Sequence, residues 1–341
     1  MIGPFSLRLL TLFQFTRMAL VFTAISNLQA SYVLSVASPG ATRDELLARL
    51  DPWVMVAFAM ISIGLYGFGM ALNDIVDHRR DLQIAADRPL PSGRLGIHMA
   101  HVVCSIFGLL AALGGWLLTT QMPNAGASLM VLAVTGMLIV FYDVAGKYLV
   151  AVGLLSLGVI RFMHALIADP TPEASSATFA HALFLLVHVT AISAVAYALE
   201  QKRPSLTRPH VLIVLAGTFT VIMLTASWLA RDVEPGMVAG HLGLVGIELV
   251  VPLTAAIVFV LIAHFIRQAD PSSRSAGKNL MLLGLLWLIV YDAAFVSVYA
   301  HWTIGLTIAL LLPLSYCSVR FMRLWSKVLQ LSQPPAYLRA P

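Results

Sequence analysis

The chain has 341 residues, of which 59% are hydrophobic and only 11% charged, and its mean hydropathy is +0.88. A soluble domain carries about a quarter charged residues, so this composition excludes a soluble globular protein and predicts an all-α polytopic membrane protein. The formal net charge of +5 leaves nucleic-acid binding open until the placement of the basic residues is considered. Cys104 and Cys317 both lie in apolar runs and provide neither a disulfide framework nor a thiolate metal site.

In chain order, ten apolar runs are candidates for membrane-crossing helices, each of which takes about 20 residues. We expect the first run to be retained, because no small-residue cleavage pattern follows it. The run 126–142 predicts a short crossing, and only "YAHW" separates the last two runs. The ten runs are 12–37, 52–72, 97–119, 126–142, 148–168, 177–199, 209–230, 241–266, 279–299 and 301–319. They predict one transmembrane domain over residues 1–330, followed by a short cytoplasmic tail at 331–341.

The lysine and arginine residues predict the orientation. With the N-terminus in the cytoplasm, only Arg43, Arg49 and Arg231 fall on the outer side. Such an inner excess is the positive-inside pattern, so the basic residues mark topology and nucleic acid is not an expected partner. The residues on the inner side are Arg8, Arg79, Arg80, Arg88, Arg94, Lys147, Lys202, Arg203, Arg208, Arg267, Arg274, Lys278, Arg320, Arg323, Lys327 and Arg339.

The segment "NDIVDHRRD", residues 73–81, follows the second run on the predicted cytoplasmic face. On a continuing helix, Asn73, Asp77 and Asp81 recur at every fourth position and project to one sector, with Asp74 beside them. Carboxylates on one helix face repel each other unless a cation lies between them, and Mg²⁺ takes oxygen ligands together with phosphates. These four residues therefore predict a magnesium-bridged phosphate or diphosphate site. An ordinary solvated loop is the alternative for any single aspartate, but a loop does not require this spacing.

The next segment, "DRPLPSGRL" at residues 87–95, predicts a stiff turn. Together, "NDIVDHRRDLQIAADRPLPSGRL" resembles the first aspartate-rich motif and the following turn of the UbiA superfamily of intramembrane prenyltransferases. Arg17 and Asn27 resemble polar positions in that family's first helix. The segment "FYDVAGKYLVAVGLLSLGVIRFMHALIA", residues 141–168, is similar to its Tyr-x-x-x-x-Lys pattern followed by a helix with an arginine.

The resemblance implies a helical bundle, usually of nine spans, around a central cavity with cytoplasmic cap loops. It implies Mg²⁺-dependent transfer of a prenyl group from a polyprenyl diphosphate to a hydrophobic or aromatic acceptor, in the lipid bilayer of a bacterial inner membrane. Departure of diphosphate develops negative charge that metal ions and cationic side chains stabilise in a water-poor site. The implied catalytic residues are Asp74, Asp77 and Asp81, and the implied substrate-binding residues are Asn27, Asn73, Tyr142, Lys147, Arg161 and Glu200.

One part of the family's pattern is missing. A second aspartate-rich motif is expected at the end of the sixth run, where "YALEQKRPSLTRP" carries only Glu200. One carboxylate does not replace two or three in holding a second metal ion. This departure keeps a second hypothesis open, namely a non-catalytic relative that binds or transports an isoprenoid or a small metabolite.

Polar residues inside the apolar runs allow two interpretations. An arginine such as Arg161 is costly within a bilayer and is expected to face a cavity or a polar partner. Asp143 either supplies a missing carboxylate or pairs with Lys147 or Arg161, and pairing is the favoured reading. Structural pairing is also expected for Asp292. With no matching cysteine–histidine cluster, we expect hydrogen-bonded core positions for His164, His181 and His188.

Overall fold

The computed structural model describes residues 4–38, 40–122, 125–171, 176–230 and 246–331. All regular structure in these ranges is helical and none of it is strand, which confirms the predicted all-α class. The predicted tail lies, after Leu331, outside the described residues.

The described helices follow the predicted apolar runs. Nine helical segments in the described ranges are long and apolar enough to cross a membrane, and α8 is a shorter apolar helix of 17 residues. The α-helices are α1 (Pro4–Phe15), α2 (Phe22–Val36), α3 (Arg43–Arg49), α4 (Pro52–Val76), α5 (His78–Ile84), α6 (Ile97–Gln121), α7 (Gly126–Val144), α8 (Val150–Leu166), α9 (Ser176–Leu199), α10 (Arg208–Leu229), α12 (Val250–Ala269), α13 (Ser273–Tyr299), α14 (Trp302–Ala309) and α15 (Leu311–Leu331). Short 3₁₀ turns are η1 (Met18–Leu20), η2 (Gly146–Tyr148) and η3 (Ile247–Leu249).

Two details of the predicted spans differ from the structure. The expectation that 126–142 is the short crossing is wrong, because α7 continues to Val144 and has 19 residues, whereas α8 is shorter. The last crossing is divided at Leu310 into α14 and α15. Pro313 lacks the N–H that would bond to the carbonyl four residues earlier, at Ala309, so the helix breaks there. The "YAHW" break is confirmed, since the His301 side chain accepts a hydrogen bond from the Thr303 N–H and starts α14.

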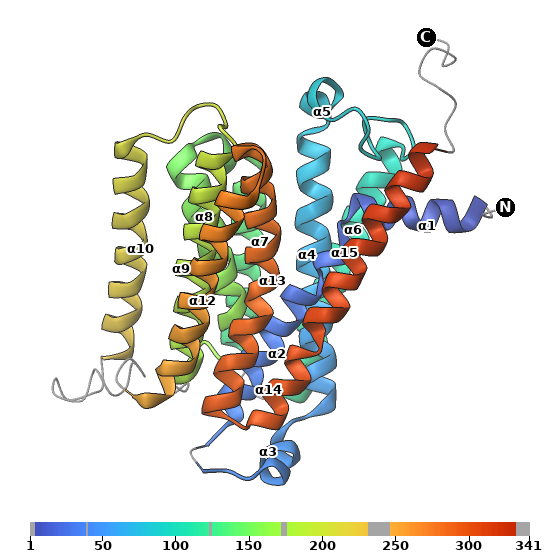
Figure 1. Ribbon diagram of the computed structural model, residues 1–341. Coiled ribbons are helices and arrows are strands. Elements are labelled where there is room, and N and C mark those ends of the chain that lie inside the picture. The colour runs from blue at the N-terminus through green and yellow to red at the C-terminus, as the bar shows by residue number, and fades with distance from the viewer. Residues whose placement is uncertain (1–3, 39, 123–124, 172–175, 231–245, 332–341) are drawn as a thin grey trace.

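The helices form one bundle with α2 inside it. The helix α2 contacts α4, α8, α9, α13 and α15, whereas α10 stands at the edge against α8 and α9 (Figure 1). The short helix α5 lies at one end of the bundle and α3 at the opposite end (Figure 1). The segment that contains the acidic residues therefore lies at one end of the bundle, as predicted.

Buried polar residues cross-link α2 to its neighbours. The Asp292 carboxylate, which is fully buried on α13, accepts a hydrogen bond from the Ser26 hydroxyl at 2.6 Å and contacts His181 Nε2 at 2.7 Å. Nδ1 of the same histidine lies 3.2 Å from the Ser31 hydroxyl. Structural pairing of Asp292 is thereby confirmed, and the cluster ties α2, α9 and α13 together.

The other two core histidines also have partners, as expected. Nε2 of His188 lies 3.0 Å from the Gly284 carbonyl oxygen, and the Tyr291 hydroxyl lies 3.2 Å from Nδ1. His164 contacts Asn27 and Ser62. Such hydrogen bonds offset the cost of placing polar groups in an apolar interior.

The close approach of α4 and α6 yields a stability prediction. A Cβ added to Gly64 would lie 2.8 Å from the Ala111 Cα atom, whereas one added to Gly108 would lie 3.6 Å from the nearest atom of Phe68, an ordinary contact. We expect Gly64→Ala to destabilise the bundle by about 2 kcal/mol through overpacking, and Gly108→Ala to change stability little. Thermal unfolding in detergent measures both, and equal midpoints would contradict the packing argument.

Candidate functional site

The acidic segment lies where α4 gives way to α5. The helix α4 ends at Val76, and Asp77, with ψ near 0°, joins it to α5. The Asp77 N–H donates to the Asn73 carbonyl at 2.9 Å, and the Asp81 N–H donates to the Asp77 carbonyl at 2.8 Å. The helical spacing of the predicted residues therefore holds, although the helix is divided in two.

Two of the three aspartates form ion pairs with arginines. Asp74 and Asp81 are each only 3% exposed. Arg17 lies 2.9 Å from the Asp74 carboxylate, while Arg88 lies 3.7 Å from Asp74 and 2.5 Å from Asp81. Arginine keeps its charge under all ordinary conditions, so in this structure each of these two carboxylates has a positively charged partner.

Arg17 reaches the site from a break between helices. It follows α1, precedes η1 and has a φ of 49°, in the left-handed region that non-glycine residues rarely occupy. The Tyr66 hydroxyl on α4 donates to the Arg17 carbonyl oxygen at 2.9 Å. The ion pair with Asp74 and this hydrogen bond hold Arg17 in its uncommon conformation.

Arg88 is held by the turn that contains it. Gly93, with a φ of 72°, allows the chain to reverse there. Arg94 then donates to the Asp87 carbonyl oxygen at 2.5 Å and to the Gln14 side chain on α1 at 2.9 Å. Burial lowers the pKa of the Arg94 guanidinium, and the nearby Asp87 carboxylate opposes that shift. The predicted turn thus attaches to α1 and places Arg88 over the aspartates.

Lys147 lies on η2, which links α7 to α8, and its ammonium group pairs with the third aspartate, Asp77. The ammonium lies 3.0 Å from Asp77 Oδ1, 3.1 Å from Asn73 Oδ1 and 3.9 Å from Asp143 Oδ1. The favoured pairing of Asp143 with Lys147 is therefore confirmed. Tyr142, beside Asp143, interacts electrostatically with Asp77 and belongs to the same cluster.

The other implied residue of α8, Arg161, lies apart from these ion pairs. Its guanidinium donates to the Thr23 hydroxyl and carbonyl oxygens on α2, at 3.2 and 3.4 Å. It also interacts electrostatically with Tyr66 and with Asp292. Tyr66 also interacts electrostatically with Arg17, whose carbonyl oxygen accepts a hydrogen bond from the Tyr66 hydroxyl.

Asn27 lies one turn further along α2 and is fully buried. Its Oδ1 atom is 3.0 Å from His164 Nδ1, and the Ser62 hydroxyl is 3.3 Å from His164 Nε2. The Asn27 Nδ2 group, a donor, has no hydrogen-bond partner within the described ranges. Because an unsatisfied buried amide is costly, this group is available to a polar atom of a ligand.

Glu200 lies at the end of α9 and does not join the cluster. Its carboxylate pairs with Lys202 at 3.2 Å, and its side chain packs where α9 meets Gly277 of α13. Among the described residues it forms no ion pair with Arg17, Arg88 or Lys147.

No group of three or more histidine, cysteine, aspartate or glutamate side chains in the described ranges is arranged to hold a metal ion by itself. Mg²⁺ does not need such a cage, since it keeps several waters and is commonly bound through one or two carboxylates and substrate phosphates. Oxygens of Asn73, Asp77 and Asp143 lie around one ammonium, and the buried Asp143 Oδ1 has no hydrogen-bond donor in the described chain. This donor set fits a magnesium ion that accompanies a phosphate.

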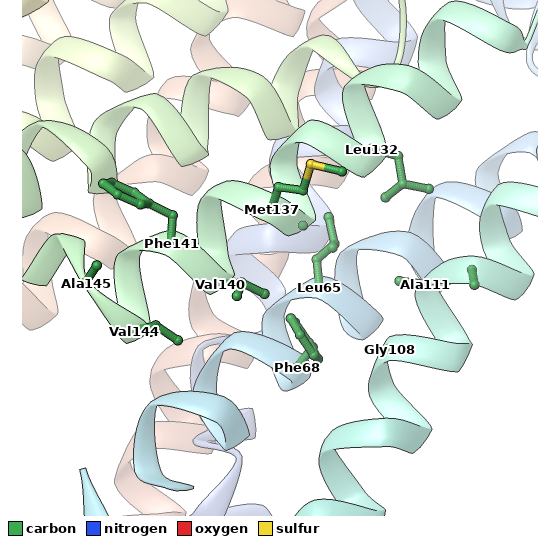
Figure 2. A pocket seen from close by; sticks show the side chains of 12 residues that line it. Leu65, Phe68, Gly108, Ala111, Leu132, Met137, Val140, Phe141, Val144 and Ala145 are labelled. Atoms are coloured by element: carbon green, nitrogen blue, oxygen red, sulfur yellow. The ribbon is translucent and has the colours of Figure 1, made fainter. Parts of the chain in front are cut away.

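An apolar groove runs between α4, α6 and α7. It has a volume of about 650 Å³, and Leu65, Phe68 and Ala111 are among its lining residues (Figure 2). Met137, Val140 and Phe141 line it from α7, as do Val144 and Ala145, which follow Asp143 in the chain. An extended hydrocarbon chain would find apolar surface here.

Sequence reasoning did not single out Tyr66 or Arg88 as site residues. Arg88 lies inside the turn at residues 87–95, directly after the acidic segment, so its position in the sequence could have identified it as a site residue. Tyr66 lies in a continuous apolar run and gave no such signal, because its role depends on the fold of the Arg17 backbone.

Comparisons with known proteins identify the family and the fold. The family model described as the UbiA prenyltransferase family matches residues 45–286. The solved structure of a digeranylgeranylglyceryl phosphate synthase in membranes superposes with a TM-score of 0.58 at 15% identity, over 86% of this chain and 98% of that chain. A UbiA homolog from Archaeoglobus fulgidus bound to DMAPP and Mg²⁺ gives a TM-score of 0.40 at 12% identity, over 91% and 99%. A search of curated proteins finds no match. The first superposition shows a shared fold.

The Lys147 contacts yield a second prediction. We expect Lys147→Gln to lower stability by about 3 kcal/mol, because it leaves the buried Asp77 and Asp143 carboxylates without their cation. Adding Asp77→Asn should recover part of the loss. Unfolding midpoints in detergent measure both, with the exposed Lys278→Gln as control. A loss no larger than that of the control would contradict the ion pairing.

Proposed function

Because the chain belongs to the UbiA prenyltransferase family, we propose that it transfers a prenyl group from a polyprenyl diphosphate to a hydrophobic or aromatic acceptor in the membrane. The observation that carries this proposal is the buried cluster in which Arg17, Arg88 and Lys147 surround the acidic end of α4. Such a cluster suits a diphosphate accompanied by a divalent cation. The positive-inside pattern supports a position on the cytoplasmic face, and we propose a bacterial inner membrane as its location.

Asn73, Asp74, Asp77 and Asp81 are the residues we propose to hold Mg²⁺ on the diphosphate. When bound, the metal supplies positive charge to the leaving oxygen. Lys147 and Arg17 carry the donors that can bind the phosphate oxygens, and arginine and lysine both suit that role. Lys147 lies on η2, between two helices, and its flexible stem allows the ammonium to turn from aspartate to phosphate.

The transfer breaks the allylic carbon–oxygen bond, and diphosphate leaves with the electron pair. An acceptor carbon or heteroatom forms the new bond and releases a proton. Tyr142 and Arg161 are further residues that we propose to bind substrate, and the Asn27 Nδ2 donor, unpartnered within the described chain, can orient a polar atom of the acceptor. The surrounding apolar residues exclude water from the reactive carbon.

We assign the apolar groove to the prenyl chain of the donor. Val144 and Ala145 of the groove lie in the chain between Asp143 and Lys147, the pair that we propose to lie at the diphosphate, and the other α7 residues of the groove precede them. A chain bound in it would have its charged end at the cluster and its hydrocarbon on Leu65, Phe68 and Met137 (Figure 2).

The degenerate second motif favours a second candidate function. Glu200, which stands where the family carries its second acidic motif, is paired with Lys202. A protein that retains a diphosphate site without transfer chemistry would bind or transport an isoprenoid or a small metabolite. Whether a new carbon–carbon or carbon–heteroatom bond forms separates the two functions.

The transferase predicts product from purified protein in lipid, supplied with radiolabelled prenyl diphosphates, Mg²⁺ and a panel of aromatic and lipid acceptors. We expect EDTA to abolish product and Asp77→Ala to lower kcat by roughly 100-fold or more, because charge stabilisation at the leaving group is lost. Asp87→Ala, which removes an exposed carboxylate from the adjoining turn, should leave the rate unchanged. Magnesium-dependent binding of the diphosphate without product from any acceptor would support the carrier instead.

The groove predicts a chain-length effect. A Cβ added to either Gly136 or Gly126 on α7 would meet no atom within 4 Å, but only Gly136 lines the groove. We expect Gly136→Phe to raise KM for long prenyl donors more than for the shortest one, since the ring occupies apolar volume that a long chain needs. Gly126→Phe is the matched control. Equal effects on all chain lengths would show that the chain lies elsewhere.

A further inference from the structure

Asp143 is a buried carboxylate that the acidic segment of α4 does not include. It lies near the end of α7 and is only 2% exposed. Its Oδ1 atom has no hydrogen-bond donor in the part of the chain that the structure describes. Asp292, an equally buried carboxylate, contacts both Ser26 and His181. A buried carboxylate oxygen without a donor needs another positive partner.

The Lys147 ammonium, which forms the ion pair of Asp143, is shared with oxygens from another helix. The Lys147 ammonium is 3.9 Å from Asp143 Oδ1, beyond hydrogen-bond distance, and 3.0 Å from Asp77 Oδ1. It also donates to Asn73 Oδ1 at 3.1 Å. The end of α4 and the end of α7 thus present three oxygen atoms to a single point of positive charge.

Four carboxylates share three cations in the ion pairs that the described residues form at this site. The carboxylates are Asp74, Asp77, Asp81 and Asp143, and the cationic side chains are Arg17, Arg88 and Lys147. The two arginines pair with Asp74 and Asp81, so Asp77 and Asp143 share the Lys147 ammonium. Lysine is a compact charge on a flexible stem, unlike the planar guanidinium. The ammonium is therefore the cation that can move away.

We propose that Asp143 binds the divalent cation that accompanies the diphosphate, together with Asn73 and Asp77, at the position that the Lys147 ammonium holds in this structure. Asp143 thereby supplies from α7 a carboxylate that the second acidic motif lacks at Glu200. Lys147 turns to the diphosphate when the cation enters. The assignment of diphosphate as co-ligand rests on the proposed function, whereas cation binding by Asp143 does not.

The test is Mn²⁺ binding to the full-length protein in nanodiscs, followed by the electron paramagnetic resonance signal of free Mn²⁺, with and without inorganic diphosphate. We expect Asp143→Asn, which keeps the shape of the side chain, to weaken Mn²⁺ binding by about tenfold or more. Asp87→Asn, which removes one exposed charge nearby, should bind as the unmodified protein does. Unchanged affinity in Asp143→Asn, or no Mn²⁺ binding by the unmodified protein, would overturn the proposal.

Thermal unfolding of the same samples separates a cation ligand from a structural ion pair. A ligand predicts that Mn²⁺ raises the unfolding midpoint of the unmodified protein more than that of Asp143→Asn. A purely structural pair predicts equal increments and refutes the proposal. If Asp143→Asn does not fold, Asn73→Asp provides the test, because a carboxylate added among the same oxygens should tighten Mn²⁺ binding, and no tightening would refute the site.

The outcome is independent of the transferase assay. Product from the unmodified protein combined with unchanged Mn²⁺ affinity in Asp143→Asn would remove this inference and leave the proposed function standing. Weakened Mn²⁺ binding in Asp143→Asn, without any product from the unmodified protein, would support cation binding by Asp143 and remove the proposed transferase function.

Discussion

The site depends on one constraint: the buried carboxylates at the end of the apolar bundle need positively charged partners. A charge removed from water costs several kcal/mol unless an opposite charge or hydrogen-bond donors lie beside it. Here the cations come from three separate parts of the chain: Arg17 between α1 and η1, Arg88 in the turn after α5, and Lys147 in η2. All three stand where the helices are interrupted. The ion pairs therefore also fix how α1, the turn and the α7–α8 link sit on the end of α4.

The same constraint shapes the interior of the bundle along α2. Thr23, Ser26, Asn27 and Ser31 recur at helical spacing, and each meets a polar or charged side chain of another helix. A polar stripe on a central helix is stable only if its neighbours supply partners, which α8, α9 and α13 do. Of the polar groups of these four residues, the Asn27 Nδ2 group has no hydrogen-bond partner in the part of the chain that the structure describes. A buried donor left in this way can bind a polar atom of a ligand.

The sequence predicted the helical class, the spans and the position of the acidic segment, because hydropathy and charge spacing are local properties. It also predicted that Asp292 and the histidines would have polar partners. It did not predict which residues these partners are, because they lie up to 266 positions away in the chain. The lengths of α7 and α8 were misjudged because the hydropathy run does not mark where η2 interrupts the helix. Tyr66 was missed because its function lies in a hydrogen bond to a backbone atom, which no residue pattern encodes.

Without the second acidic motif, the site can still offer oxygen donors to a cation from more than one helix. A divalent cation requires oxygen donors from more than one direction, but it does not matter which helix carries them. Glu200 is engaged by Lys202 at the end of α9, whereas Asp143 on α7 faces Asp77 across Lys147. The carboxylate opposite the first motif would then have moved from one helix end to another within the same bundle. On this argument the missing motif tells against a second metal ion on α9, but not against a bound cation or the chemistry that the cation supports.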